Sequence, residues 1–476
     1  MASCNGLSRS FLPSLKTRPG FAKIENMEPV RVVISLYGAR KQKWNINVAQ
    51  TSAPSRLHPG KDGKFRRNLS EDIRGLMELY EAAQLSFQGE YILDEAASFS
   101  SQLLHQYCLD VDDNLSRIVM GMLRYPYHKT IPRLTRKDFL QHFEGINGWG
   151  KTLKELAIMD LRKGQSVYQG ELTQVSKWWN ELGLEKKLKL VRNQIPKWYT
   201  WSMSILIDDF SLSLQRVELT KSVAFIYLID DIFDVVGTLD ELTIFTEAVN
   251  KWEYTAVDML PDYMKMCYWA LLDTTNHISL EIYKRHGHNP IDSLKTSWAS
   301  LCSAYLVEAK WFASGVSPTA NMHLENGKVS TGVYVVLVHL FFLLGLGRTS
   351  GGTINLPDVS ELISGVATIL RLWNDLGGAK DGNEDGTDGS YIDFYMKDHP
   401  GLSMAQAQDH VIDTIASEWK SLNKECFRLN HFSASSFKRA SLNLARIIPL
   451  MYDYDDNQRL PVLEDYVKFM LLNQTT

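Results

Sequence analysis

The stretch VAFIYLIDDIFDVV, residues 223–236, places three aspartates in an otherwise apolar run. On a helix of 3.6 residues per turn, Asp230 and Asp234 share one face and Asp231 lies beside them. Burying an unpaired carboxylate costs several kcal/mol, and the stretch itself contains no Lys or Arg that could pair with the three. It therefore predicts a helix that brings two or three carboxylates to one point.

A cation is the simplest partner for such a cluster, because carboxylate oxygens without nearby Cys or His are ligands of hard ions. Mg2+ commonly takes one or two carboxylates together with phosphate oxygens and water. The pattern thus predicts a Mg2+ site, with Mn2+ as the alternative ion, and a substrate that carries phosphate. An alternative interpretation, in which the aspartates cap helices or form ion pairs, stays open on this stretch alone.

Composition narrows the class of protein. The chain has 476 residues, of which 45% are apolar, so it can bury one or two large cores. A net charge of −4, with no basic stripe, argues against a nucleic-acid partner. The five cysteines form neither a disulfide framework nor a zinc motif. The most apolar run, residues 333–346, is too short to cross a bilayer, so we expect it to form a core helix and expect no transmembrane segment. We also expect the protein to be a monomer.

Helical patterning begins near residue 70 and continues to the end of the chain, with short Gly, Pro or Ser breaks and no sustained alternation typical of a sheet. At its start, Ser70 can cap a helix whose apolar stripe includes Ile73, Leu76 and Tyr80. We therefore expect an all-α protein.

The chain divides into four predicted segments. Residues 1–30 hold several Arg, Lys and Ser residues and no acidic residue before Glu25, which is typical of an organellar transit peptide, here a plastid one; a disordered basic terminus is the alternative. Residues 31–62 are expected to be a linker or poorly ordered. A short helical domain is predicted over residues 63–159, and a larger one that holds the aspartates over residues 160–476.

A second polar group occurs in ILRLWNDLGG, where Arg371, Asn374 and Asp375 fall at i, i+3 and i+4 and share a helix face. Two interpretations stay open here: the opposite wall of the same site, or a polar cluster at a helix end. Gly332 can break a helix and turn backbone carbonyls toward a cavity, although an ordinary helix start explains it equally well.

With both stretches in view, the chain resembles plant terpene synthases of class I. It is most similar to the subgroup that makes acyclic tertiary alcohols, the linalool and nerolidol synthases. The resemblance runs from about residue 62 to the end and is carried by VELTKSVAFIYLIDDIFD, SWASLCSAYLVEAKWF, ILRLWNDLG and SLNLARIIPLMYDYDDNQRLP, which match in order and spacing. It implies a class I terpenoid synthase helical bundle preceded by a truncated N-terminal helical domain.

The same resemblance implies the roles of particular residues. Arg371 and Arg192 would hold the leaving diphosphate, since Arg192 matches the first arginine of the family's Arg-x-Arg motif, and Trp201 matches an active-site aromatic residue. The metal ligands implied by the two acidic motifs are Asp230, Asp231, Asp234 and Asn374. The residues implied to bind the substrate are Arg192, Asp230, Asp234, Arg371 and Asn374.

The implied reaction starts from geranyl or farnesyl diphosphate. Mg2+ ions between two acidic walls, together with the guanidinium groups, would draw off the diphosphate. Trp201 would stabilise the allylic cation, and water captured at the tertiary carbon would give linalool or nerolidol. Plastid residence would favour the ten-carbon substrate, and the cytosol is the alternative location.

The chain also departs from the family pattern. Gly378 and Gly382 stand where the second metal motif carries Ser or Thr and then Glu, which leaves Asn374 as its ligand, and Glu384 is two residues out of phase. Gln194 replaces the second arginine of Arg-x-Arg, and the tandem-arginine motif near the N-terminus is absent. The glutamine at position 194 and the absence of the tandem-arginine motif are both features of the acyclic subgroup.

Two rival interpretations remain open. One is a catalytically impaired or inactive relative that only binds diphosphate, which the two glycines and the short N-terminal domain favour. The other is a chain-elongating prenyltransferase, which needs a second aspartate-rich motif that this chain does not match. Gas chromatography of the products from each diphosphate with Mg2+ would separate the three.

Restoring the second motif with Gly378→Ser and Gly382→Glu together is expected to lower the Mg2+ requirement, because the motif regains two oxygen donors. The rate should rise by more than about tenfold, or about 1.4 kcal/mol of barrier. The measurement is a Mg2+ titration of product formation for the parent and the double variant. Identical curves would show that these glycines do not limit the enzyme, and would point to Glu384 as a substitute ligand.

Overall fold

Every regular element in the described part of the chain is a helix, which confirms the all-α prediction. The computed structural model describes residues 72–111, 114–134, 149–184, 194–347, 354–378, 389–429, 435–455 and 459–472. The predicted transit peptide and linker lie outside these residues, as do Arg192, Gly382 and Glu384.

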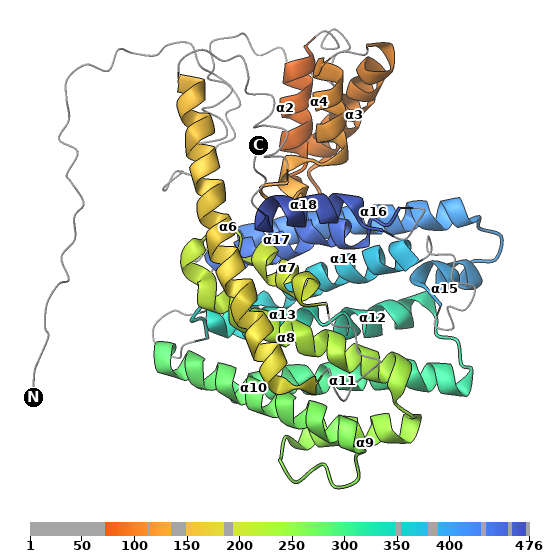
Figure 1. Ribbon diagram of the computed structural model, residues 1–476. Coiled ribbons are helices and arrows are strands. Elements are labelled where there is room, and N and C mark those ends of the chain that lie inside the picture. Colours follow the sequence, from red (N-terminus) through yellow and green to blue (C-terminus); the bar gives the residue numbers. More distant parts are fainter. Residues whose placement is uncertain are drawn as a thin grey trace, which may run out of the picture. The chain divides into compact units, whose positions relative to one another are not determined.

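Figure 1 shows the order of the described helices along the chain. The first are α2 (Ile73–Ala83), α3 (Tyr91–Asp110), α4 (Asn114–Arg124) and the 3₁₀ turn η2 (Tyr127–Lys129). Those of the middle of the chain are α6 (Trp149–Leu182), α7 (Ile195–Ile205), η4 (Phe210–Leu212), α8 (Ser213–Asp231), the π-helical turn η5 (Ile232–Val236), α9 (Leu239–Lys251), α10 (Asp262–His286) and α11 (Ile291–Ser314). The last are α12 (Ala320–Ser330), α13 (Val333–Leu343), η6 (Leu356–Val359), α14 (Ser360–Gly378), α15 (Tyr391–Asp398), α16 (Met404–Arg428), α17 (Ser435–Tyr452) and α18 (Pro461–Leu471).

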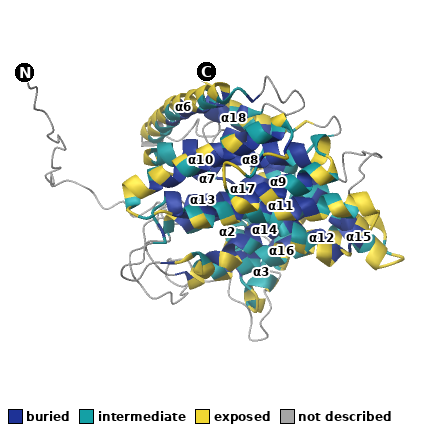
Figure 2. Ribbon diagram, turned by 90° about the horizontal axis from the view of Figure 1, so that it is seen from below, coloured by how far each residue is buried: buried dark blue, intermediate teal, exposed yellow. Residues whose placement is uncertain are grey.

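Two separate hydrophobic clusters form the described cores. A small one joins α2, α3 and α4 around Leu76, Leu104 and Val119, and a much larger one is shared by the helices from α6 onward. Figure 2 shows buried residues gathered on the inner faces of helices such as α8, α11, α13 and α14. The expected domain boundary at residue 160 falls inside α6, which is one continuous helix. We propose that α2–α4 form the N-terminal unit and the later helices the larger one.

The start of α2 differs in detail from the prediction. Asp72 rather than Ser70 caps the helix, because its carboxylate accepts a hydrogen bond from the Gly75 amide at 2.9 Å. The predicted apolar stripe is confirmed: Leu76 is fully buried, and Ile73 and Tyr80 pack against it. Local preference thus identified the helix but misplaced its cap by two residues.

Asn423 of α16 holds the N-terminal helices against the larger bundle. This buried side chain donates to the backbone carbonyls of Gln84 at 3.0 Å and Ser86 at 2.9 Å. Its carbonyl accepts from Nε2 of His128 at 2.7 Å. Burial and the nearby Arg446 lower the pKa of His128 to about 4, so the ring is neutral near pH 7.

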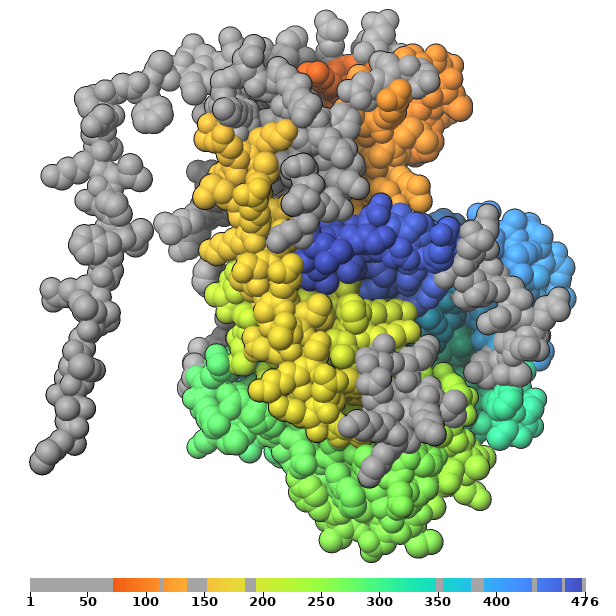
Figure 3. All heavy atoms as spheres, in the orientation of Figure 1, coloured from red at the N-terminus to blue at the C-terminus, as the bar shows by residue number. Residues whose placement is uncertain are grey.

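The C-terminal end of α18 packs against α6 (Figures 1 and 3). Gln165 of α6 donates to the carbonyls of Phe469 and Leu472, both at 2.9 Å. These contacts satisfy backbone groups at the end of α18 that the helix itself leaves unpaired. The last described helix is therefore tied to the first helix of the larger bundle.

The most apolar segment lies in the core, as predicted. By length and composition, residues Ala320–Leu343 could cross a membrane, but 72% of their most apolar window is buried inside the protein. Gly332 divides the segment into α12 and α13 and adopts a φ of 73°. Gly332 thus separates α12 from α13 and is also the N-cap of α13, which agrees with both interpretations of this glycine, and the segment forms two core helices.

Gly332→Ala is expected to destabilise the protein by about 2 to 4 kcal/mol, because the new side chain would need left-handed backbone and would overpack the core. Its Cβ would lie 2.7 Å from Cγ2 of Ile226. The midpoint of urea unfolding would report the loss.

Gly287→Ala is the matched control, since Gly287 has a φ of 71° but nothing within 4 Å of an added Cβ. It should lower the free energy of unfolding by only about 1 kcal/mol, because alanine there meets only the unfavourable left-handed backbone conformation. Equal shifts of the urea midpoint for both variants would mean that the contact between residue 332 and Ile226 is not tight.

Candidate active site

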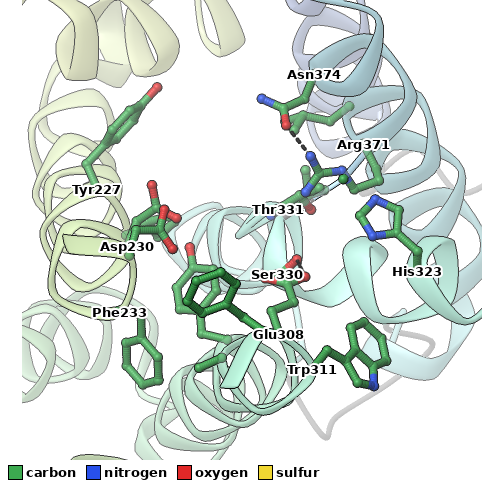
Figure 4. A pocket seen from close by; sticks show the side chains of 18 of the residues that line it. Tyr227, Asp230, Phe233, Glu308, Trp311, His323, Ser330, Thr331, Arg371 and Asn374 are labelled. Atoms are coloured by element: carbon green, nitrogen blue, oxygen red, sulfur yellow. Dashed lines mark hydrogen bonds between the residues drawn. The ribbon is translucent and has the colours of Figure 1, made fainter. Parts of the chain in front are cut away.

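A cavity of about 1290 Å³ lies among α7, α8, α11, α12 and α14 (Figure 4). It exceeds the roughly 300 to 1000 Å³ typical of small-molecule pockets. Five of the residues expected at the site, Trp201, Asp230, Asp234, Arg371 and Asn374, line it together. The two sequence stretches therefore meet at one cavity, which favours the interpretation of the second stretch as the opposite wall of the same site.

The aspartate wall is built by the end of α8 and the π-helical turn η5. Asp230 lies in the last turn of α8 and Asp234 in η5, and both line the cavity. The wider turn closes with a hydrogen bond from the Gly237 amide to the Ile232 carbonyl at 2.8 Å. Such π turns occur mostly at functional sites, and the α-helical pattern had not predicted this one.

Asp231 differs from its two neighbours. Its side chain is buried, with 2% of the residue exposed, and it is not among the residues that line the cavity. Two rather than three carboxylates of the motif therefore face the cavity. Adjacent helical positions point about 100° apart, so Asp230 and Asp231 cannot both face the same space squarely.

The opposite wall belongs to α14, where Arg371 donates through Nη2 to Asn374 and to Asp375. Figure 4 shows Arg371 and Asn374 across the cavity from Asp230. Burial opposes the charge on Asp375, but Arg371 and His323 outweigh it and hold the pKa of that carboxyl below its usual value. Asp375 therefore stays ionised behind the wall and anchors the guanidinium group.

A further carboxylate, Glu308 of α11, lies between the two walls (Figure 4). It accepts hydrogen bonds from the Ser330 hydroxyl at 2.7 Å and the Asn326 amide at 2.9 Å. Burial raises the pKa of Glu308, and Arg371 opposes that shift. Glu308 was not predicted from the sequence. It lies three positions after Tyr305 in an apolar helical stretch, and an acidic residue in such a stretch is the same pattern that identified the aspartates.

Aromatic and apolar side chains line much of the cavity. The indole of Trp201 donates to the hydroxyl of Tyr227 at 3.0 Å, which orients both rings. Phe233 and Tyr305 pack with ring centroids 5.5 Å apart. Burial and the nearby carboxylates, Asp230 first, raise the pKa of Tyr305, which keeps its hydroxyl protonated. The apolar lining residues include Ile205, Val223, Ile226, Val336 and Leu444.

A basic residue on α7 was also missed. Lys197 lines the cavity, and its ammonium group lies 5.7 Å from the centre of the Tyr227 ring. It follows Gln194, the residue that replaces the expected second arginine, by one helical turn. A second cation therefore faces the cavity from a position that the Arg-x-Arg pattern does not include.

The carboxylates fit a metal ion that takes its remaining ligands from outside the protein. No group of three or more His, Cys, Asp and Glu side chains that could enclose a metal occurs among the described residues. Asp230 and Asp234 both line the cavity instead. Mg2+ suits such a pair, because it commonly binds one or two carboxylates and completes its shell with phosphate oxygens and water.

Comparison with known proteins agrees with this geometry. Residues 180–421 match the family model of the terpene synthase metal binding domain, and residues 58–123 match that of the terpene synthase N-terminal domain. A chloroplastic tricyclene synthase from Antirrhinum majus is 64% identical over 412 residues, which cover 87% of this chain and 71% of that protein. The chain therefore belongs to the terpene synthase family and is an enzyme of the lyase class.

Two alcohol synthases are also similar. An (E)-nerolidol synthase from Cannabis sativa is 47% identical, covering 86% of this chain and 74% of its own. The S-(+)-linalool synthase of Arabidopsis thaliana, named as chloroplastic, is 45% identical, covering 86% and 72%. The family expectation is confirmed, but identity is higher with the tricyclene synthase than with either alcohol synthase.

A solved structure shares the fold. Isoprene synthase from grey poplar, in complex with three Mg2+ ions and dimethylallyl-S-thiolodiphosphate, has a TM-score of 0.79 at 31% identity. The match covers 89% of this chain and 80% of that one. The expected class I terpenoid synthase fold is thereby confirmed, and the matched metal binding domain indicates dependence on a divalent metal.

Gly327→Ala is expected to push Arg371 from its position, because the new Cβ would lie 2.8 Å from Cγ of that side chain. Misplacing this cavity-lining guanidinium should lower kcat/KM for a prenyl diphosphate by roughly tenfold to a hundredfold. The free energy of unfolding should change little, since alanine favours a helix by about 0.5 to 1 kcal/mol over glycine. Steady-state kinetics and a thermal melt would measure both.

Gly170→Ala in α6 is the control, because nothing lies within 4 Å of an added Cβ there. It should leave kcat/KM at the parent value. A Gly327→Ala variant with parental kinetics would mean that the position of Arg371 against α12 is unimportant.

Proposed function

We propose that this enzyme ionises geranyl or farnesyl diphosphate with Mg2+ and captures the resulting cation with water, which yields an acyclic tertiary alcohol, linalool or nerolidol. The observation that carries the proposal is that Asp230 faces Arg371 across a cavity that Asp234 also lines and that is otherwise largely aromatic and apolar. Such a cavity suits a molecule with a metal-bound anionic head and a hydrocarbon tail.

The charged head is assigned to the two walls. Asp230, Asp234 and Asn374 are proposed to hold Mg2+, which when bound acts as a Lewis acid on the diphosphate. Asp231, which the motif had suggested as a further ligand, is assigned a supporting role because its side chain is buried away from the cavity. Arg371 is proposed to bind the diphosphate oxygens, since a guanidinium fork matches phosphate geometry.

Three further groups complete the proposed diphosphate and cation sites. Arg192 keeps its proposed role at the diphosphate on the resemblance alone, and Lys197, which lines the cavity, is added to it. Trp201 is proposed to stabilise the allylic cation with its ring face, as aromatic rings attract cations within about 6 Å. Phe233 lines the same space without a group that could react with the cation.

The identity of the product allows a second candidate. Gln194 in place of the second arginine and the similarity to the linalool and nerolidol synthases favour the acyclic alcohol. The 64% identity with a tricyclene synthase favours a ring-closed hydrocarbon from the same cation. The two candidates share the ionisation step and differ in whether water or an internal double bond captures the cation.

A plastid location is proposed for the enzyme, with the cytosol as the alternative. The tricyclene and linalool synthases are both named as chloroplastic, and the basic, Ser-rich residues 1–30 agree with import. This location favours the ten-carbon substrate. We propose that the enzyme works as a monomer, because one chain contributes both walls of the cavity.

The proposal is tested by incubating the protein with geranyl and farnesyl diphosphate, each with Mg2+, and analysing the products by gas chromatography and mass spectrometry. Linalool or nerolidol as the main product would support the acyclic alcohol. Tricyclene would establish the second candidate. A longer prenyl diphosphate, or release of no product, would overturn both.

Asp230→Asn is expected to lower kcat by at least about a hundredfold, or about 2.7 kcal/mol of barrier, because the metal loses one of its two proposed carboxylates on this wall. The helical circular dichroism signal and the melting temperature should stay at parental values, since the residue faces the cavity. Asp258→Asn is the control: this carboxylate is exposed and does not line the cavity. An active Asp230→Asn variant would refute the metal assignment.

A further inference from the structure

We propose that His323 is a positioning residue for Arg371. It holds the buried Asp375 carboxylate in place, so that Arg371 can be shared between Asp375 and the diphosphate of the substrate. The inference rests on the proposed function, because it requires that Arg371 binds diphosphate. Neither His323 nor Asp375 belongs to the aspartate motif of residues 230–234, and no pattern in the sequence connects the two.

The donors of Arg371 are only partly engaged by acceptors among the described residues. Its Nη2 is engaged by two acceptors on its own helix, Asn374 and Asp375. Its Nε is buried and has no hydrogen-bond partner among the described residues. An unpaired buried donor is costly, so the guanidinium retains the capacity to bind an acceptor that enters the cavity. Phosphate oxygens are such acceptors.

The carboxylate of Asp375 is held in place by several donors and orients Arg371. Its side chain is only 2% exposed, and it accepts hydrogen bonds from groups on three different helices. Arg371 donates from α14, Nε2 of His323 donates from α12 at 3.0 Å, and the backbone amide of Tyr391 donates from the start of α15 at 2.9 Å. A carboxylate with these partners orients Arg371 from the side that faces away from the cavity.

When the substrate binds, its diphosphate and Asp375 compete for the guanidinium of Arg371. A diphosphate draws the guanidinium of Arg371 toward the cavity, which weakens its pairing with Asp375. A buried carboxylate that loses its partner is strongly destabilised, so without its other donors Asp375 would pull Arg371 back. The backbone amide of Tyr391 is one of these donors, and the imidazole N–H of His323 is the side-chain donor that remains. His323 therefore lowers the cost of turning Arg371 toward the substrate.

The position of His323 is itself fixed by packing. Its ring lies 5.0 Å from the ring of Phe394 on α15, and both residues line the cavity. Figure 4 shows His323 beside Arg371 at the cavity wall. A purely structural role in packing α12 against α15 is thus the competing explanation, and it needs the ring but not the N–H.

Two substitutions separate these explanations. His323→Phe keeps an aromatic ring against Phe394 and removes the donor, whereas His323→Gln keeps an N–H donor of similar reach. The probe is inorganic diphosphate with saturating Mg2+, titrated into each protein by calorimetry. His323→Phe is expected to weaken diphosphate binding by about tenfold or more, the usual effect of one hydrogen bond to a charged group. His323→Gln should bind within about threefold of the parent.

A double-mutant cycle tests the path through Asp375. In an Asp375→Asn background, His323→Phe should cause no further loss of diphosphate binding, because the buried charge that His323 serves is gone. Full additivity of the two losses would overturn the proposal. His277→Phe, at an exposed histidine away from the cavity, is the control for the substitution itself and should bind like the parent.

The remaining outcomes are also decisive. If the parent fails to bind diphosphate, the proposed function fails and this inference with it. If the parent binds and His323→Phe binds equally well, only the inference fails. If His323→Phe does not fold, the smaller His323→Leu replaces it, and parental affinity in that folded variant overturns the proposal. A lower melting temperature with unchanged affinity would assign His323 to packing alone.

Discussion

The separation of opposite charges across an apolar cavity is the constraint on which this structure depends. Asp230 and Asp234 face the cavity together, and their mutual repulsion is strong where the surroundings are of low dielectric constant. A cation relieves that repulsion, while Arg371 on the opposite wall attracts an anion. A metal-bound diphosphate, the ligand proposed above, would satisfy both walls at once, and the apolar lining would strengthen each interaction by lowering the local dielectric constant.

The helices are broken and packed in ways that hold these groups in place. Gly332 ends one helix and starts the next with a left-handed backbone conformation, which lets Ile226 pack directly against it. Gly327 has no side chain, so the stem of Arg371 lies against the backbone of α12. The π turn after α8 lets Asp234 face the cavity in the turn that follows Asp230. The first two features position the apolar Ile226 and the stem of Arg371, and the π turn exchanges regular helix geometry for the position of Asp234.

Much of the fold followed from local patterns. Apolar residues at helical spacing predicted the helices, because each segment must bury one face whatever its neighbours are. The break at Gly332 and the start of α2 were also predicted, although Asp72 and not Ser70 caps the latter. The boundary expected at residue 160 lies within α6, since a continuous helix can cross between two cores without any signal in its own sequence.

The sequence by itself determined the helical class, the aspartate motif, the shared helix face of Arg371 and Asn374 and, through resemblance, the family. These properties depend on residues within a few turns of one another. Only the tertiary structure decided that Asp231 is buried away from the cavity, that Glu308 and Lys197 face it, and that His323 reaches Asp375 across 52 positions of the chain. Helical periodicity fixes which residues share a face, but the packing of distant helices decides what that face meets.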